Sequence, residues 1–78
     1  MNNYRRKYII ETINQLELLK DDIINIKSEE EDYFNNIPEN LQYSLDAENS
    51  QNAICELENA ECSIEDVISS LQNSIDVM

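Results

Sequence analysis

A chain of 78 residues forms one domain at most, and it buries so little surface that a core without disulfide, metal or partner is marginal. It contains no glycine and one proline, which disfavours β-sandwiches and barrels because these folds need turn residues at short intervals. The composition therefore predicts an all-α protein. Its 17 acids and 5 bases give a formal net charge of −12, so we expect an acidic protein that does not bind nucleic acid directly.

The sequence contains no signal for a membrane or for export. No apolar run approaches the roughly 20 residues that a membrane-spanning helix requires, and the first residues lack the apolar stretch of a signal peptide. We therefore expect a cytoplasmic protein without membrane contact. Cys55 and Cys62 are seven residues apart, about 10 Å along a helix, which is too far for a disulfide. Free thiols are expected, with a contact between subunits as the alternative.

The first predicted helix covers about residues 3–34. Its apolar side chains recur in steps of three and four and form one stripe along the helix. The stripe comprises Ile9, Thr12, Leu16, Leu19, Ile23 and Ile26, with Ile13 beside it. Ile10 and Ile24 lie on a shoulder of this stripe, so the apolar face is wider than one partner helix covers. The extra width predicts a second neighbour.

A corner is predicted over about residues 35–46. In a chain without glycine, Asn35 or Asn36 is expected to supply the left-handed residue that ends the first helix. Pro38 has its φ preset for a helical first turn, so the second helix either continues from Pro38 or restarts near Ala47 behind a cap at Ser44 or Asp46. An apolar plug, or alternatively a partner-binding tip, is expected from Tyr33, Phe34, Ile37, Leu41, Tyr43 and Leu45.

This corner has a recognisable sequence, Glu31-Asp-Tyr-Phe-Asn-Asn-Ile-Pro-Glu-Asn-Leu-Gln-Tyr-Ser44, set between two acidic periodic helices. The order resembles a group of short acidic helical-hairpin proteins of Gram-positive bacteria and their phages. The resemblance covers nearly the whole chain, and its most specific part runs from Asn36 to Ser44. It implies a helical hairpin in a phage or mobile-element setting, and it implies no activity.

The second predicted helix covers about residues 47–77 and has its own stripe. The stripe comprises Ile54, Leu57, Glu61, Ile64, Ile68, Leu71, Ile75 and Met78, with Ala53, Ala60 and Val67 alongside. Glu61 either sets the register as a polar residue or, as we favour, marks a place where the stripe rotates toward solvent. Two such helices of about 42 Å predict an antiparallel hairpin, and a homodimer of hairpins predicts a four-helix bundle.

The two charge signs are strongly separated along the chain. All five bases lie in the first 27 residues, whereas the remaining 51 residues hold 13 acids and no base. A solvated surface is one explanation, because net charge keeps small proteins apart. The other is a basic partner, since a dimer would hold a charge of −24 over about 42 Å, close to the roughly 25 charges of duplex DNA of that length.

From this charge we expect a non-enzymatic protein that binds and inhibits a basic surface on a nuclease, a defence protein or another nucleic-acid-handling protein, in part by nucleic-acid mimicry. The expected contact charges are Glu29, Glu30, Glu31, Asp32, Glu56, Glu58, Glu65 and Asp66. Arg5, Arg6 and Lys7 are expected to pair with Asp76 and the C-terminal carboxylate across the hairpin.

A structural adaptor is the main alternative. Its contact surface for another helical protein would be Ile10, Ile24, Phe34 and Ile37. An enzyme is not expected, because the chain has no histidine, no glycine-rich phosphate loop and no metal-ligand spacing, so no cofactor or metal is predicted. Consecutive acids such as Glu29 to Asp32 point around a helix in different directions and do not converge on an ion.

Overall fold

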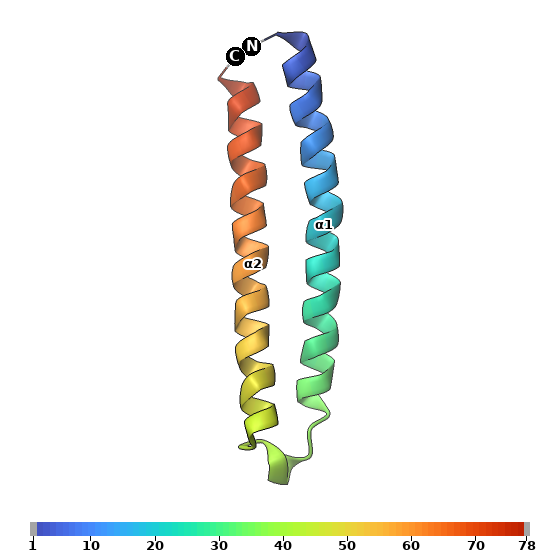
Figure 1. Ribbon diagram of the computed structural model, residues 1–78, viewed down its shortest axis with the longest axis vertical. Helices are drawn as coiled ribbons and strands as arrows, with labels where there is room; N and C mark the ends of the chain where they lie inside the picture. The colour runs from blue at the N-terminus through green and yellow to red at the C-terminus, as the bar shows by residue number, and fades with distance from the viewer. Residues whose placement is uncertain (1, 78) are drawn as a thin grey trace.

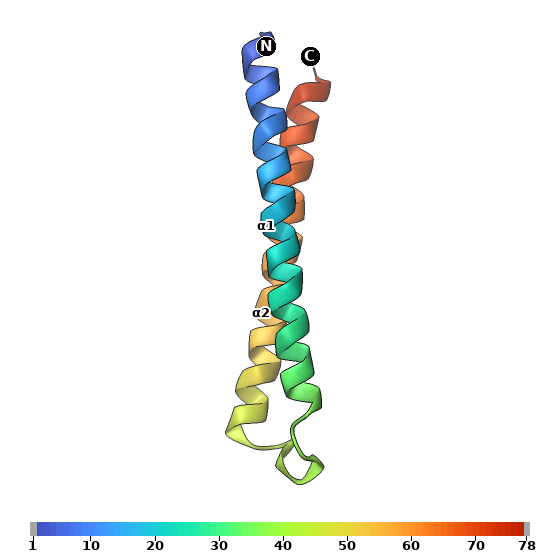
Figure 2. The same ribbon diagram turned by 90° about the vertical axis from the view of Figure 1, so that its right-hand side faces the viewer.

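The computed structural model describes residues 2–77, which form an antiparallel helical hairpin. The helices are α1 (Asn3–Asn35) and α2 (Leu45–Asp76), and a short 3-10 helix, η1 (Glu39–Leu41), lies in the corner between them. The two long helices lie side by side along their whole length, so the start of α1 and the end of α2 lie at the same end of the rod, opposite the corner (Figures 1 and 2). The rod measures 60 × 16 × 13 Å. The predicted all-α hairpin is confirmed, and none of its described helices is long and apolar enough to cross a membrane.

Both long helices begin at side-chain caps. The Asn2 Oδ1 atom accepts a hydrogen bond of 2.9 Å from the Arg5 backbone N–H, and the Ser44 hydroxyl accepts one of 3.2 Å from the Ala47 N–H. Each cap satisfies a backbone donor that has no partner within the helix. Because Ser44 caps α2 at Leu45, the second helix restarts after the corner and does not continue from Pro38.

The corner is built without any left-handed residue, so the role predicted for Asn35 or Asn36 is wrong. Asn36 has φ −92° and ψ −2°, and the described residues include no positive φ. Instead α1 stays right-handed to its end, and the Ile37 N–H bonds to the Phe34 carbonyl. Pro38, at φ −54° and ψ 145°, then extends the chain into η1. The Gln42 side chain donates a 2.8 Å hydrogen bond to the Ile37 carbonyl and closes the corner.

A contact seam with a seven-residue repeat joins the two helices. Its members are half-buried or buried and recur in alternating steps of three and four, as in a coiled coil. On α1 they are Arg6, Ile9, Ile13, Leu16, Lys20, Ile23, Lys27, Glu30 and Phe34. On α2 they are Ala47, Ser50, Ile54, Leu57, Glu61, Ile64, Ile68, Leu71 and Ile75, which include the described residues of the predicted stripe.

The stripe predicted for α1 is rotated relative to the observed seam. Leu19 and Ile26 are 53% and 52% exposed, whereas Ile24, expected on the shoulder, is half-buried. The prediction followed apolar residues alone, but the seam contains Lys20 and Lys27 at positions where an apolar residue would be expected. The most apolar side of α1 therefore points partly past α2, toward one side of the hairpin.

The isolated hairpin has almost no core. Within the described chain, the buried residues are Ala47 and Ser50, and no large side chain is fully buried. The accessible surface is 5878 Å², whereas a compact monomer of 9.1 kDa exposes about 4,900 Å². The excess of about 1,000 Å² reflects a rod in which each helix has a single neighbour.

The predicted plug under the corner forms only in part. Phe34 and Ile37 are half-buried there, so they do not present the exposed adaptor surface that was predicted. Tyr43 is fully exposed and Leu45 is 71% exposed, so neither belongs to a plug. Both residues lie where the chain leaves η1 and enters α2.

Candidate interaction surfaces

The centre of the seam contains an ion pair between the helices. The Lys27 Nζ lies 3.0 Å from the Glu61 carboxylate, and the two side chains are 21% and 23% exposed. The hydrogen bond to Glu61 raises the pKa of Lys27 above its ordinary value, and the nearby Glu31 and Glu58 add to this effect. Glu61 therefore sits inside the seam with a cationic partner, and the favoured prediction that the stripe rotates toward solvent there is wrong.

Two further polar contacts cross the hairpin. The Lys20 Nζ lies 3.8 Å from both Glu17 and Glu65, and the Ser50 hydroxyl donates a 2.8 Å hydrogen bond to Glu30. Ser50 is 3% exposed, so its hydroxyl needs this acceptor. These contacts favour one axial register of the two helices, because Lys20, Lys27 and Ser50 each find a polar partner on the opposite helix.

One side of the hairpin is acidic, and we call it the charged face. Lys20 and Lys27 direct their ammonium groups toward this side. Lys20 forms ion pairs with Glu17 and Glu65, and the charges of Glu31 and Glu58 lie near enough to Lys27 to raise its pKa. The residues that directly follow every second seam position, starting from Ile9 on α1 and Ser50 on α2, make up this face. They are Ile10, Glu17, Ile24 and Glu31 on α1, and Gln51, Glu58, Glu65 and Gln72 on α2.

The predicted contact acids do not share one surface. Glu31, Glu58 and Glu65 lie on the charged face, whereas Glu30 lies in the seam against Ser50. The others, Glu29, Asp32, Glu56 and Asp66, are exposed on the remaining helix surfaces. Ile10 and Ile24, the predicted apolar shoulder, also fall on the charged face among acids.

The opposite side of the hairpin is apolar and has no neighbour, and we call it the apolar face. Its residues directly precede every second seam position, starting from Ile13 on α1 and Ile54 on α2, and so recur every seven residues. They are Thr12, Leu19, Ile26 and Tyr33 on α1, and Ala53, Ala60, Val67 and Ser74 on α2. The Tyr33 hydroxyl donates to the Asp46 carboxylate, which shows that the two rows lie on the same side of the hairpin. That hydrogen bond raises the pKa of Tyr33.

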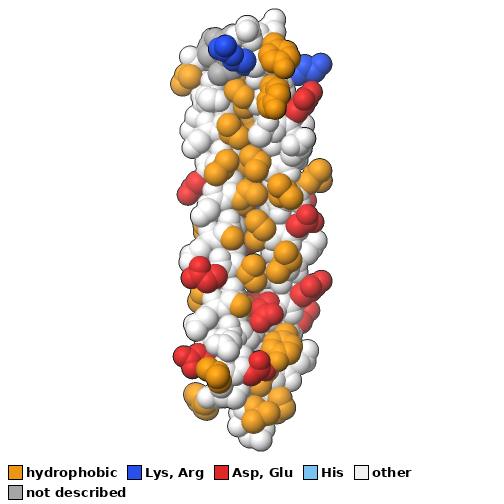
Figure 3. Space-filling view, viewed as in Figure 1, with side chains coloured by type: hydrophobic (Ala, Val, Ile, Leu, Met, Phe, Trp, Pro, Cys, Tyr) orange, Lys and Arg blue, Asp and Glu red, His pale blue; other side chains and the backbone are white. Residues whose placement is uncertain are grey.

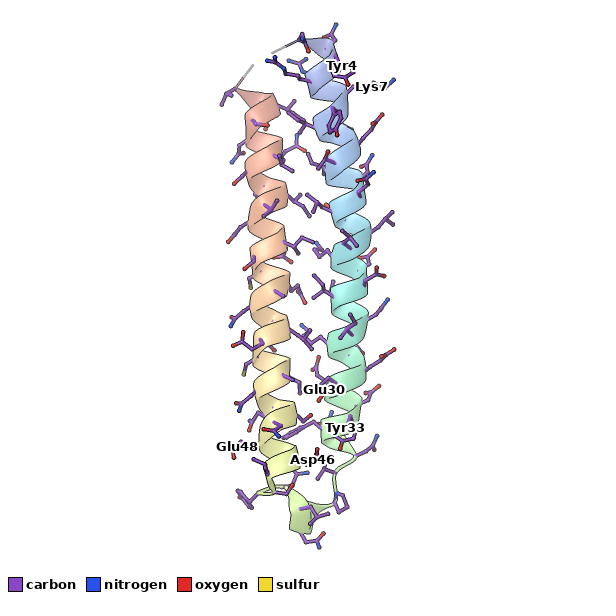
Figure 4. The ribbon with its side chains drawn as sticks, viewed as in Figure 1. Tyr4, Lys7, Glu30, Tyr33, Asp46 and Glu48 are labelled. Carbon is purple, nitrogen blue, oxygen red and sulfur yellow. The ribbon has the colours of Figure 1, made fainter. Side chains whose placement is uncertain are left out.

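Figure 3 shows this arrangement as a continuous hydrophobic stripe along the line between the helices, with acids at its margins and toward the corner. Leu19, Ile26 and Val67 are each about half exposed, at 48% or more. In Figure 4, Tyr33 and Asp46 face one another near the corner, and Glu30 lies between the helices above them. No single residue in the sequence identifies this face. Its position depends on how far the apolar stripe predicted for α1 is rotated from the observed seam.

Three of the five cationic residues, Arg5, Arg6 and Lys7, lie in the first turns of α1, at the end of the rod where Figure 3 shows cationic side chains. Within residues 2–77 no ion pair joins Arg5, Arg6 or Lys7 to Asp76, so this predicted pairing is wrong, and the C-terminal carboxylate lies outside the described residues. Tyr4 and Tyr8 pack with ring centroids 6.3 Å apart and, with Lys7, line a shallow hollow on the outside of α1. Arg5 and Lys7 are exposed at this tip of the rod, whereas Arg6 is half-buried in the seam.

A second shallow hollow lies at the corner. It is lined by Tyr33, Ile37, Pro38, Leu41 and Asp46 among others, and it is largely apolar. Cys55 and Cys62 are exposed free thiols on α2, and among residues 2–77 no three potential metal ligands cluster. Comparison with protein families, with curated proteins and with solved structures finds no match to this chain.

Proposed function

We propose that this chain is a non-enzymatic acidic interaction protein that binds a basic surface on another protein, such as a nuclease, a defence protein or another nucleic-acid-handling protein, and inhibits it. The observation that supports this proposal is the separation of negative from positive charge along the chain. Residues 28–78 contain 13 acids and no base, and a chain selected only for stability would relieve their mutual repulsion with lysines on the same helix.

Most of these acids have no cationic partner of their own. Within residues 2–77 the acids in ion pairs are Glu17, Glu61 and Glu65, and Lys20 and Lys27 supply the cations. The acids Glu31 and Glu58 flank the Lys27–Glu61 pair without forming an ion pair themselves. An unpaired carboxylate on a rigid helix is already positioned for an incoming Lys or Arg, and its field steers a basic partner toward it.

The length of the rod changes the comparison with nucleic acid. Two copies would hold a charge of −24 over 60 Å, whereas duplex DNA of that length has about 35 charges. The 60 Å extent includes the corner and exceeds the 42 Å expected for the helices, so the predicted equality of charge density does not hold. The proposal therefore depends on where the acids lie on the rod, and mimicry of a duplex would be approximate.

We also propose that the hairpin dimerises into a four-helix bundle. What supports this is the missing core, because helices of 33 and 32 residues pack with no large side chain fully buried in the described chain. A small domain with so little burial is marginal alone, and oligomerisation is the common remedy. An acid-covered bundle would present the contact charges on its outside.

The experiment that tests the function is a pull-down with the tagged chain from the natural host, read by mass spectrometry at 50 and 500 mM salt. A partner of the proposed kind is lost at high salt and is competed by duplex DNA. The variant Glu31→Gln/Glu58→Gln should lose it, whereas Glu11→Gln/Asp76→Asn, with the same charge change at the other end of the rod, should retain it. Binding that is indifferent to salt, to DNA and to both variants would exclude the proposal.

A structural adaptor is the second candidate, and the uncovered apolar face favours it. Another helical protein could complete the bundle in place of a second copy. The adaptor predicts a partner that survives 500 mM salt and is lost on Ile26→Glu. The residues predicted for this role, Ile10 and Ile24, would have no effect, because they lie among the acids of the charged face.

A further inference from the structure

We propose that the apolar face is the docking surface for a second copy of this chain, and that the second copy lies antiparallel, with its corner beside the termini of the first. The inference rests on the dimer of the proposed function and specifies its interface and polarity.

The composition of the apolar face suits burial against an identical face. Between Thr12 and Ile26 on α1, and between Ala53 and Ser74 on α2, the rows of this face contain no charged residue. The acids Glu17, Glu58 and Glu65 lie on the opposite side of the hairpin, where they would stay in water. Two chains of charge −12 can therefore associate through this face without burying like charges against each other.

The area available matches what a stable dimer needs. The hairpin exposes about 1,000 Å² more than a compact protein of its mass, given its accessible surface of 5878 Å². A standard interface removes about 800 Å² from each partner. The half-exposed side chains Leu19, Ile26 and Val67 supply an apolar centre for such an interface, and the seam residues beneath them would lose their remaining exposure.

The register of the rows accommodates the antiparallel arrangement. The α1 row is centred between residues 22 and 23, and the α2 row between residues 63 and 64. The contacts Lys20–Glu65 and Lys27–Glu61 place these two centres at nearly the same height on the rod. A two-fold axis across the rod at this height therefore superposes each row on its own copy.

This operation gives good packing on both helices. Leu19 would meet Ile26 of the second copy, and Ala60 would meet Val67 of the second copy. The small side chains Ala53, Ala60 and Ser74 let α2 approach its copy closely, at about 8 Å between axes. Because the side chains of the α1 row are larger, the two α1 helices would lie further apart than the two α2 helices.

The ends of the rod also favour the antiparallel arrangement. The cations Arg5 and Lys7 lie at the terminal end, and the acids Glu39, Asp46 and Glu48 lie at the corner. A parallel pair would place two cationic ends together and two acidic corners together. In the antiparallel pair each cationic end lies beside an acidic corner, which improves the electrostatic complementarity of the interface.

Distances between spin labels test the polarity of the dimer. In a Cys55→Ser/Cys62→Ser background, one label at Asn3→Cys should give a distance of about 60 Å between copies if they are antiparallel, and about 20 Å if they are parallel. A second label at Asn25→Cys, near the midpoint, should give roughly 30 Å or less in either arrangement, so it reports whether the dimer exists. A short Asn3 distance with a short Asn25 distance overturns the polarity and leaves the dimer intact.

A matched pair of variants tests the docking face. Ala60→Asp places a charge in the proposed interface, and Asn59→Asp places the same charge one residue away on the outside of α2. In sedimentation, Ala60→Asp should weaken dimerisation at least about 100-fold, whereas Asn59→Asp should leave it nearly unchanged. Equal dimerisation by the two variants overturns the docking face, and a wild-type monomer at micromolar concentration overturns the dimer itself. Neither result bears on binding of a basic partner by the charged face, which the pull-down measures separately.

Discussion

The two long sides of the hairpin differ in chemistry although the same two helices build them. On the charged face, Glu17, Glu31, Glu58 and Glu65 surround two lysines that reach across the seam. On the apolar face, Leu19 and Ile26 lie opposite a row of small side chains on α2, with no charge between them. A hairpin that worked alone would gain nothing from such a difference, because water would bathe both sides equally.

The two lysines of the seam direct their charges to the same side of the hairpin. Lys20 and Lys27 occupy seam positions, but their ammonium groups reach the acids of the charged face. Their aliphatic stems can cover the seam while the charges stay near solvent. The apolar face is thereby left free of cations along its centre. The proposed basic partner would use the charged face, and the proposed second copy would use the apolar face.

The strongest way to break the comparison is to place a charge on each face in turn. Leu19→Glu on the apolar face should raise the dimer dissociation constant about 100-fold or more, because it buries an unpaired carboxylate. Ile10→Glu, on the charged face at a similar exposure of 45%, should change it little. Sedimentation equilibrium measures both. Equal effects would mean that the two faces do not differ in function.

A substitution in the seam should lower the stability of the hairpin without acting on either face. Leu57→Ala removes a half-buried side chain at the helix contact and should lower the free energy of unfolding by about 2 kcal/mol. Urea denaturation at several protein concentrations measures this cost. Wild type and Leu57→Ala should both become more stable as concentration rises, whereas Leu19→Glu should not. A concentration-independent wild type would contradict coupled folding and association.

A lysine on the charged face should separate stability from function. Glu58→Lys relieves repulsion with Glu61 but also loses the attraction of Glu58 to Lys27, so the stability of the hairpin should change little. It should reduce capture of the basic partner, because it removes a contact charge and adds a repulsive one. Thermal unfolding and the pull-down provide the two measurements. A variant that is less stable and still binds would show that these acids serve the fold.

The smallest expected effect is a dependence on alkaline pH. The pKa of Lys27 is raised by its hydrogen bond to Glu61, so the pair stabilises the folded state below the ordinary lysine pKa of 10.5. This contribution is lost as pH rises through the higher pKa of the folded state. Lys27→Met should therefore show a smaller fall in urea midpoint between pH 9 and pH 12 than wild type does. Tyr33 titrates equally in both proteins, which makes their difference specific to Lys27.

Much of the fold follows from local sequence alone. The steps of three and four, the absence of glycine and the cap at Ser44 predict two long helices and a corner, and the structure contains them. Helix ends are readable because caps and prolines act on neighbouring residues. The stripe on α2 was also readable, because its only interruption, Glu61, stands between apolar residues in the correct steps.

The contact between the helices was decided only by the tertiary structure. Whether Glu61 faces water or Lys27 depends on a residue 34 positions away, and no local pattern contains that pairing. The same holds for the rotation of α1, where Lys20 and Lys27 take seam positions and Leu19 and Ile26 turn aside. The sequence by itself determined two amphipathic helices and a separation of charge along the chain. The packing of one helix on the other determined which apolar residues remain uncovered, because burial is a property of pairs of surfaces.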